Sequence, residues 1–187
     1  MSAPRIAIVG ATGAVGHEFL RVLAEREFPM GSLKLLASPR SAGQKLTFRG
    51  EQHVVEALAD DSFGDVDVVF FSAGGDTSRK FAPKAVDAGA VVIDNSSAFR
   101  MQHDVPLVVP EVNRAALAGH QGIIANPNCS TIILVLALQP LHQAAGLRSV
   151  VVSTYQAASG AGQRAMDELH RATRAVLAGE QPPKPDA

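Results

Sequence analysis

A glycine-rich turn between an apolar run and an amphipathic helix pattern constrains this chain more than any other feature. Residues 5–9 (RIAIV) indicate a short buried parallel strand, and residues 10–16 (GATGAVG) follow it directly. The next residues show a helical period, with the apolar Phe19, Leu20 and Leu23 set between charged positions. Strand, glycine-rich turn and helix in this order are the context in which a dinucleotide-binding turn occurs.

The glycines of this turn suggest a site for the pyrophosphate of a dinucleotide. Gly10 and Gly13 would allow a tight turn and a close approach of the backbone to the phosphates, and Gly16 would let the helix pack on the strand. The N-terminus of the helix would face the phosphates. The spacing is GxxGxxG rather than the commoner GxGxxG, and a glycine triplet alone indicates only a tight strand–helix turn. The flanking strand and helix favour the cofactor site.

The residues after the second predicted strand favour NADP over NAD. This strand, residues 33–37, ends at Ser38, and neither Asp nor Glu stands nearby to hold a ribose 2′-hydroxyl. Arg40, with Ser38 and Ser41 beside it, would instead clamp a 2′-phosphate through its planar guanidinium and two hydroxyl groups. The alternative is a solvated loop arginine.

Strands and helices continue to alternate along the chain. We expect a helix at about 77–88 and further strands at 46–48, 54–56, 66–71 and 90–94. Ser72 and Gly74 follow the third buried strand, and their small side chains would leave room for a cofactor at the strand ends. The alternation predicts an α/β fold with a doubly wound, mostly parallel Rossmann-type sheet.

The segment 127–131 (PNCST) holds the only cysteine of the sequence, between a strand-like run at 122–125 and an apolar run at 132–138. The second run is too short to span a bilayer and predicts a helix buried nearly all round. Asn128 would then be the N-cap, and Cys129 would lie at a strand-to-helix junction where helix N–H groups and the helix dipole stabilise a thiolate. A nucleophile is one interpretation of Cys129, and a small buried core cysteine is the other.

A polar loop, residues 94–100 (DNSSAFR), follows the strand at 90–94. Ligands bind outside the strand ends in sheets of this kind, so the loop is a candidate binding segment. Arg100 in this loop suggests recognition of a carboxylate or a phosphate, and the alternative is a surface arginine that closes the loop.

Charge and composition restrict the partners and the compartment. The 187 residues carry a formal net charge of −1, so neither nucleic acid nor an anionic membrane surface is expected as a partner. A single cysteine allows no internal disulfide and suits a reducing compartment. No targeting segment is recognisable, and the six histidines are scattered without a metal-ligand cluster. We therefore expect a cytoplasmic protein without a metal site.

These pieces together resemble the aspartate-semialdehyde dehydrogenase family. The matching motifs follow the family's order and cover essentially the whole chain: residues 10–16, 38–41 (SPRS), 72–75 (SAGG), 94–100, 109–113 (VPEVN), 127–131 and 153–160 (STYQAASG). The resemblance implies that Cys129 is the nucleophile and that Arg100 binds the phosphate of the substrate. It also implies that Gln156 orients the substrate and that Asn128 binds the substrate. The residues that it implies for NADP binding are Gly10, Thr12, Gly13, Ala14, Val15, Ser38, Arg40, Ser41, Ser72, Gly74, Ser159 and Gly160.

The reaction that the resemblance implies is the NADP-dependent reductive dephosphorylation of L-aspartyl 4-phosphate to L-aspartate 4-semialdehyde through a cysteine thioester. This step belongs to the biosynthesis of lysine, methionine and threonine, and full-length members are expected to be homodimers or homotetramers. A related enzyme, N-acetyl-γ-glutamyl-phosphate reductase, also reacts through a thioester, but the sequence of residues 128–131 (NCST) argues against it. A catalytically silent NADP-binding module is a third interpretation.

Two parts of the chain are expected. Residues 1–128 would form the NADP-binding domain, and residues 129–187 would begin an α+β catalytic and dimerisation domain with a strand at 149–155 and a helix at 163–177. Members of the family continue well beyond this length, and their C-terminal half supplies a catalytic histidine and an arginine for the substrate carboxylate. Neither has a counterpart here, so we expect an incomplete catalytic domain and little or no turnover from the 187 residues alone.

Overall fold

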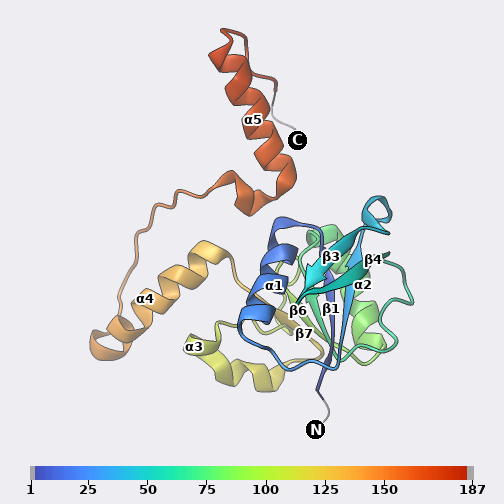
Figure 1. The fold of residues 1–187 in the computed structure, drawn as a ribbon. Helices are drawn as coiled ribbons and strands as arrows, with labels where there is room; N and C mark the ends of the chain where they lie inside the picture. Colours follow the sequence, from blue (N-terminus) through green and yellow to red (C-terminus); the bar gives the residue numbers. More distant parts are fainter. Residues whose placement is uncertain (1–2, 185–187) are drawn as a thin grey trace. The chain divides into compact units, whose positions relative to one another are not determined.

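A seven-stranded, mostly parallel sheet forms the centre of the first part of the chain (Figure 1). The structure is a computed structural model, and it describes residues 3–184. In the order in which they neighbour one another, the strands are β3 (Lys45–Phe48), β4 (Glu51–Ala57), β2 (Ser32–Ala37), β1 (Arg5–Val9), β5 (Val68–Phe71), β6 (Val91–Asp94) and β7 (Ile123–Ala125). Neighbouring strands are parallel except for β3 and β4. The predicted doubly wound Rossmann-type sheet is confirmed.

Helices cover both faces of this sheet. The α-helices of the first part are α1 (Ala14–Glu25), α2 (Gly75–Asp87), α3 (Pro110–Asn113) and α4 (Cys129–Ala145). Along β1, Ile8 shares an apolar cluster with Leu20 of α1, whereas Val9 shares another with Ala82 of α2. Successive strand residues point to opposite faces, so the unbroken apolar run of β1 is what a sheet covered on both sides requires.

The two short strands predicted at 46–48 and 54–56 are confirmed, and they form the hairpin of β3 and β4. Its turn residues, Arg49 and Gly50, have φ values of 50° and 84°. Positive φ at both turn positions is typical of the tight turns that match the twist of a hairpin. β4 also pairs with β2, in parallel, so the hairpin extends the main sheet.

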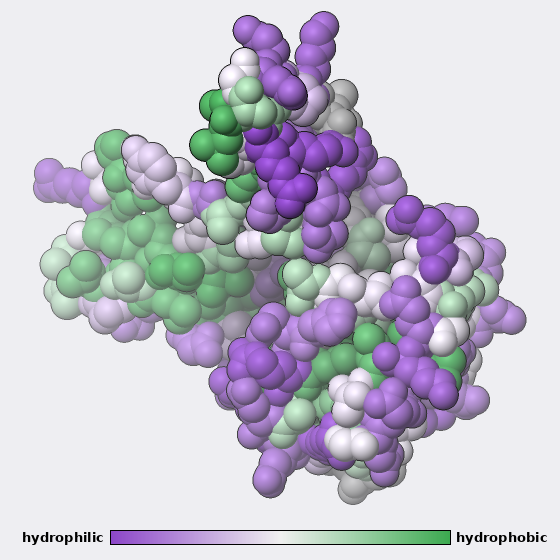
Figure 2. All heavy atoms as spheres, turned by 45° about the horizontal axis from the view of Figure 1, so that its top comes forward, coloured by the Kyte–Doolittle hydropathy of each residue, from purple (hydrophilic) through white to green (hydrophobic). Residues whose placement is uncertain are grey.

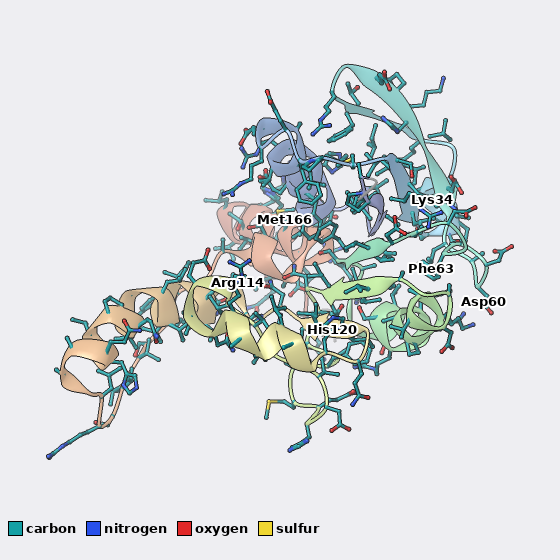
Figure 3. All side chains as sticks on the ribbon, turned by 90° about the horizontal axis from the view of Figure 1, so that it is seen from below. Lys34, Asp60, Phe63, Arg114, His120 and Met166 are labelled. Carbon is teal, nitrogen blue, oxygen red and sulfur yellow. The ribbon has the colours of Figure 1, made fainter. Side chains whose placement is uncertain are left out.

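An ion pair joins the first residue of β1 to the residue before β5. The backbone N–H of Arg5 donates to Asp67 Oδ2 at 2.7 Å, and one terminal guanidinium nitrogen donates to Asp67 Oδ1 at 2.8 Å. These hydrogen bonds lower the pKa of Asp67 to about 2. A second tie lies between β2 and the loop that connects β4 to β5, where Lys34 donates to the carbonyl of Ser62; Figure 3 labels Lys34 and two residues of this loop, Asp60 and Phe63.

The helix after Cys129 is confirmed, but the prediction that it is buried nearly all round is wrong. No described residue of α4 is buried, and Ile133 is 71% exposed. The faces of the sheet are already covered by α1 and α2, so α4 extends from the sheet and packs chiefly against α3. Figure 2 shows apolar side chains gathered over the arm that α4 forms in Figure 1. The C-cap of the helix is Gly146, with φ of 70°.

The predicted strand at 149–155 is also wrong. These residues are irregular in the structure, and each of them is exposed, with Val151 at 98% and Tyr155 at 99%. A strand needs a neighbour to accept and donate its backbone hydrogen bonds. Among residues 3–184 no segment pairs with this one.

The chain divides into two compact units, Met1–Val150 and Val151–Ala187. The second unit contains a short 3-10 segment, η3 (Ala158–Ala161), and the helix α5 (Gln163–Leu177), which confirms the helix expected there. Met166 of α5 is labelled in Figure 3. Residues 185–187, the end of the expected catalytic domain, lie outside the described residues. The expected boundary between residues 128 and 129 stays a prediction.

Candidate active site

The carboxyl ends of the parallel strands lie at one edge of the sheet, and five of the loops at this edge carry predicted site residues. They begin at Gly10 after β1, Ser38 after β2, Ser72 after β5, Asn95 after β6 and Asn126 after β7. β1 lies between β2 and β5, so the direction of the strand order reverses beside Gly10. Ligands of open α/β sheets bind outside the strand ends at such a reversal.

The turn after β1 requires glycine at two positions. Gly10 has φ of 88°, and a Cβ atom there would lie 2.4 Å from the carbonyl oxygen of Ser72. A Cβ atom at Gly16 would lie 2.4 Å from the carbonyl oxygen of Gly10. The turn is closed by a 3.0 Å hydrogen bond from the N–H of Gly13 to the carbonyl of Gly10. Helix α1 therefore starts directly above the end of β1, and the N–H groups of its first turn have no acceptor within the helix.

The loop after β2 is joined to this turn. Thr12 Oγ1 donates to Ser41 Oγ at 3.4 Å, and Ser41 ends a short 3-10 segment, η1 (Pro39–Ser41). Arg40, in the middle of η1, and Ser38, before it, are both exposed. The groups collected here can all donate hydrogen bonds: backbone N–H groups, hydroxyls and a guanidinium. This donor set fits the phosphates of a dinucleotide such as NADP.

Arg100 is held beside the ends of β6 and β7. Its Nε donates to the carbonyl of Asn126 at 3.0 Å, and a terminal guanidinium nitrogen donates to the carbonyl of Asn95 at 3.0 Å. The side chains of these two asparagines are also joined, because Asn126 Nδ2 donates to Asn95 Oδ1 at 2.7 Å. The guanidinium has five N–H donors in a fixed fork, so donors remain for an anion at this edge.

Cys129 lies at the first position of α4, three residues after Asn126. The predicted N-cap is confirmed: Asn128 Oδ1 accepts a 3.0 Å hydrogen bond from the N–H of Ser130. Cys129 is exposed, so the interpretation of it as a buried core cysteine is wrong within the described residues 3–184. The structure brings Cys129 and Arg100 to the same group of loops, because the guanidinium is bonded to the segment that leads into α4.

A buried carboxylate lies under these loops and was not singled out from the sequence. Asp94, the last residue of β6, is 0% exposed, and its two oxygens accept 2.6 Å hydrogen bonds from the hydroxyls of Ser78 and Ser96. Ser96 is adjacent in the loop, but Ser78 comes from α2, sixteen positions earlier. No sequence pattern marks that contact.

The remaining predicted site residues lie in the second unit. Gln156, Ser159 and Gly160 are all exposed, and Gln156 Nε2 donates to Thr154 Oγ1 at 3.5 Å. Ser159 and Gly160 lie in η3. The structure therefore brings the predicted residues between Gly10 and Cys129 to one edge of the sheet, and the roles of all the predicted site residues stay predictions.

Comparison with protein families decides the relationship. A family model described as semialdehyde dehydrogenase, NAD binding domain, matches residues 5–120. The chain belongs to the semialdehyde dehydrogenase family. A second model of this family, described as its dimerisation domain, matches residues 138–187.

Individual members of the semialdehyde dehydrogenase family are closely similar. Aspartate-semialdehyde dehydrogenase of Bacillus subtilis is 56% identical over 176 residues, which are 94% of this chain and 51% of the relative. The enzyme of the same name from Synechocystis is 55% identical over 178 residues, or 95% of this chain and 53% of the relative. The chain thus spans about half the length of these relatives.

Solved structures agree with the family assignment. Aspartate semialdehyde dehydrogenase II of Vibrio cholerae, in complex with ASA, has a TM-score of 0.92 and 47% identity, and the match covers 99% of this chain and 56% of that one. Aspartate semialdehyde dehydrogenase of Candida albicans, with NADP, has a TM-score of 0.64 and 32% identity over 77% of this chain and 48% of that one.

In the part of the chain that the structure describes, no helix is both long and apolar enough to cross a membrane.

Proposed function

We propose that this chain is the cofactor-binding and nucleophile-bearing part of an NADP-dependent aspartate-semialdehyde dehydrogenase. The enzyme would convert L-aspartyl 4-phosphate to L-aspartate 4-semialdehyde in the cytoplasm, in the biosynthesis of lysine, methionine and threonine. One observation carries the proposal: the guanidinium of Arg100 is bonded to the segment that delivers Cys129 to the start of α4. A nucleophile and an anion-binding group at one edge suit an acyl phosphate substrate.

Cys129 is the nucleophile of this proposal. It lies at the first position of α4, where the N–H groups of the helix start favour an anionic ligand. The sulfur attacks the acyl carbon of the substrate, the bond from that carbon to the phosphate oxygen breaks, and phosphate leaves, so that a thioester forms on Cys129. N–H groups of the first turn of α4 are also placed to stabilise negative charge on the acyl oxygen.

Arg100 is the phosphate anchor. Two hydrogen bonds to backbone carbonyls fix its orientation before substrate arrives, so that little conformational entropy is lost on binding. Asn128 and Gln156 would contact the same substrate, as the family resemblance implies. Full-length chains would act as homodimers, which the match to a dimerisation domain supports.

NADP would be held by the turn after β1 and the loop after β2. The N–H groups of the turn would face the pyrophosphate, and Arg40, Ser38 and Ser41 would bind the 2′-phosphate. Thr12, through its contact with Ser41, keeps the two loops together. When bound, the cofactor supplies the hydride that reduces the acyl carbon. Turnover by these 187 residues alone is expected to be very low or absent, because the chain spans about half the length of its relatives.

A thiol-trapping experiment tests the proposal. The purified chain is incubated with L-aspartyl 4-phosphate, and Cys129 is examined by intact mass and peptide mapping. The expected result is an acyl adduct on Cys129 that hydroxylamine removes and that Cys129→Ser lacks. N-acetyl-γ-glutamyl phosphate is the matched control substrate, and faster acylation by it would assign the sister reaction instead. NADPH binding without acylation by either substrate would indicate a catalytically silent NADP-binding module.

A further inference from the structure

The buried carboxylate of Asp94 is tied to two different elements. Ser78 of α2 donates to Oδ1, and Ser96 of the loop after β6 donates to Oδ2, both at 2.6 Å. Burial of a carboxylate is strongly unfavourable unless hydrogen bonds compensate for the lost water. The proposed reaction gives Asp94 no direct part, because it is 0% exposed.

The Ser96 side of this carboxylate is linked to Arg100 by hydrogen bonds within the turn at 95–100 and by the short stretch of chain between them. Ser96 Oγ accepts from the N–H of Ala98 at 3.0 Å, so one side chain fixes the start of the turn that ends at Arg100. The preceding residue, Asn95, accepts from the Arg100 guanidinium through its carbonyl and from Asn126 through its side chain. The N–H of Asn126 in turn donates to the carbonyl of Asp94 at 2.8 Å.

We propose that Asp94 is a positioning residue: through Ser96 it fixes the turn at 95–100 and thereby holds the Arg100 guanidinium against the segment that carries Cys129. This inference rests on the proposed function in taking Arg100 as the anion-binding group. Two nitrogens of the Arg100 guanidinium donate to backbone carbonyls. The position of the Asn95 carbonyl depends on this turn, and that of the Asn126 carbonyl depends on β7. A turn released from Asp94 moves the Asn95 carbonyl, so the guanidinium loses one of its two supports.

The two serines supply a matched pair of variants. Ser78→Ala removes one 2.6 Å hydrogen bond from the buried carboxylate, and Ser96→Ala removes one as well, together with the 3.0 Å hydrogen bond from the Ala98 N–H. Asp94→Asn is the third variant, because it leaves both serines and the Ala98 contact in place. A role of Asp94 through Ser96 predicts that Ser96→Ala and Asp94→Asn behave alike and differ from Ser78→Ala.

The measured quantity is how much faster Cys129 reacts with an anionic alkylating agent than with a neutral one. Cys129 is the only cysteine of the chain, and it is exposed, so each alkylation event reports on its surroundings. Rates are measured with anionic iodoacetate and neutral iodoacetamide, and their ratio is divided by the same ratio for the urea-unfolded chain. A positioned guanidinium raises this normalised ratio by about fivefold, the factor for unit charges about 4 Å apart in water.

The expected result is a raised ratio in the unmodified chain and in Ser78→Ala, and a lower ratio in Ser96→Ala, Asp94→Asn and Arg100→Ala. If Arg100→Ala leaves the ratio unchanged, the anion-binding role of Arg100, and with it the proposed function, loses its support. If Arg100→Ala lowers the ratio but Ser96→Ala matches Ser78→Ala, only the positioning role of Asp94 is overturned. Should Ser96→Ala fail to fold, as judged by circular dichroism, Asp94→Asn decides: a retained ratio in the folded variant overturns the inference.

Discussion

The sheet and the helix α4 have similarly apolar sequences but opposite environments. Ile8 of β1 is 0% exposed, whereas Ile133 of α4 is 71% exposed. Strand β1 has neighbouring strands on both sides and helices on both faces, all supplied by residues 3–125. The helix α4 has only α3 as a substantial neighbour among the described residues.

The difference teaches that apolar patterning specifies what an element needs, not whether the same stretch of chain supplies it. A helix that is apolar all round needs covering on every side. Residues 138–187 match a family model described as a dimerisation domain, and the relatives are about twice as long as this chain. Strand β1, in contrast, finds its neighbours within residues 3–125.

The largest effect is expected from the same substitution made in both regions. Ile8→Ala should lower the free energy of unfolding by about 3 kcal/mol, because it removes a side chain from a closed core. Ile133→Ala should change it by less than about 0.5 kcal/mol, because that side chain is already in water. Urea unfolding followed by circular dichroism measures both. Equal losses would show that α4 is covered in solution and would end the contrast.

The next effect concerns the loop after β2, where Arg40 lies at the proposed cofactor site. Arg40→Ala should weaken NADPH binding roughly tenfold or more, the usual range for hydrogen bonds to a charged group. NADH binding should hardly change, because NADH lacks the 2′-phosphate that the guanidinium would contact. Fluorescence titration with both nucleotides makes the measurement, and Lys45→Ala is a control for general loss of positive charge. Equal affinity of the unmodified chain for NADPH and NADH contradicts the NADP assignment.

The same contrast explains how much could be predicted from the sequence. Features set by neighbouring residues were predictable: the strand, turn and helix of 5–25, and the Asn128 cap. Features that depend on distant partners were not. The Ser78 contact to Asp94 joins two elements across the fold, and Arg100 reaches a carbonyl 26 positions away. The strand expected at 149–155 has the right alternation, but no partner strand exists among residues 3–184.

A smaller effect is expected at the amino end of the sheet, where pH reports on the Arg5–Asp67 pair. The pKa of Asp67 is lowered to about 2 by the hydrogen bonds from Arg5. A lowered pKa in the folded state means that the pair stabilises the fold above the ordinary aspartate pKa, about 3.9, and that this contribution is lost as the pH falls.

Asp67→Asn should therefore be less stable than the unmodified chain at pH 7, and the difference should shrink steadily between about pH 4 and pH 2. Urea unfolding across this pH range gives the difference directly. The pair is partly exposed, so high salt should reduce the difference at pH 7. A difference that stays constant down to pH 2 would exclude the ion pair as its source.

The smallest effect on stability, and the sharpest test of the contrast, is a charge on the exposed face of α4. Ile133→Glu should leave the free energy of unfolding within about 0.5 kcal/mol of the unmodified chain, because the Ile133 side chain is 71% exposed and packs against little. It should nevertheless reduce self-association, because exposed apolar faces of this kind pair with one another in water. Sedimentation velocity over a concentration series measures the association. Met101→Glu is the control, since Met101 is 94% exposed and lies in the loop after β6, away from α4 in the sequence. If both substitutions change the association equally, net charge rather than the α4 face controls it, and the two regions do not differ in the way that their burial indicates.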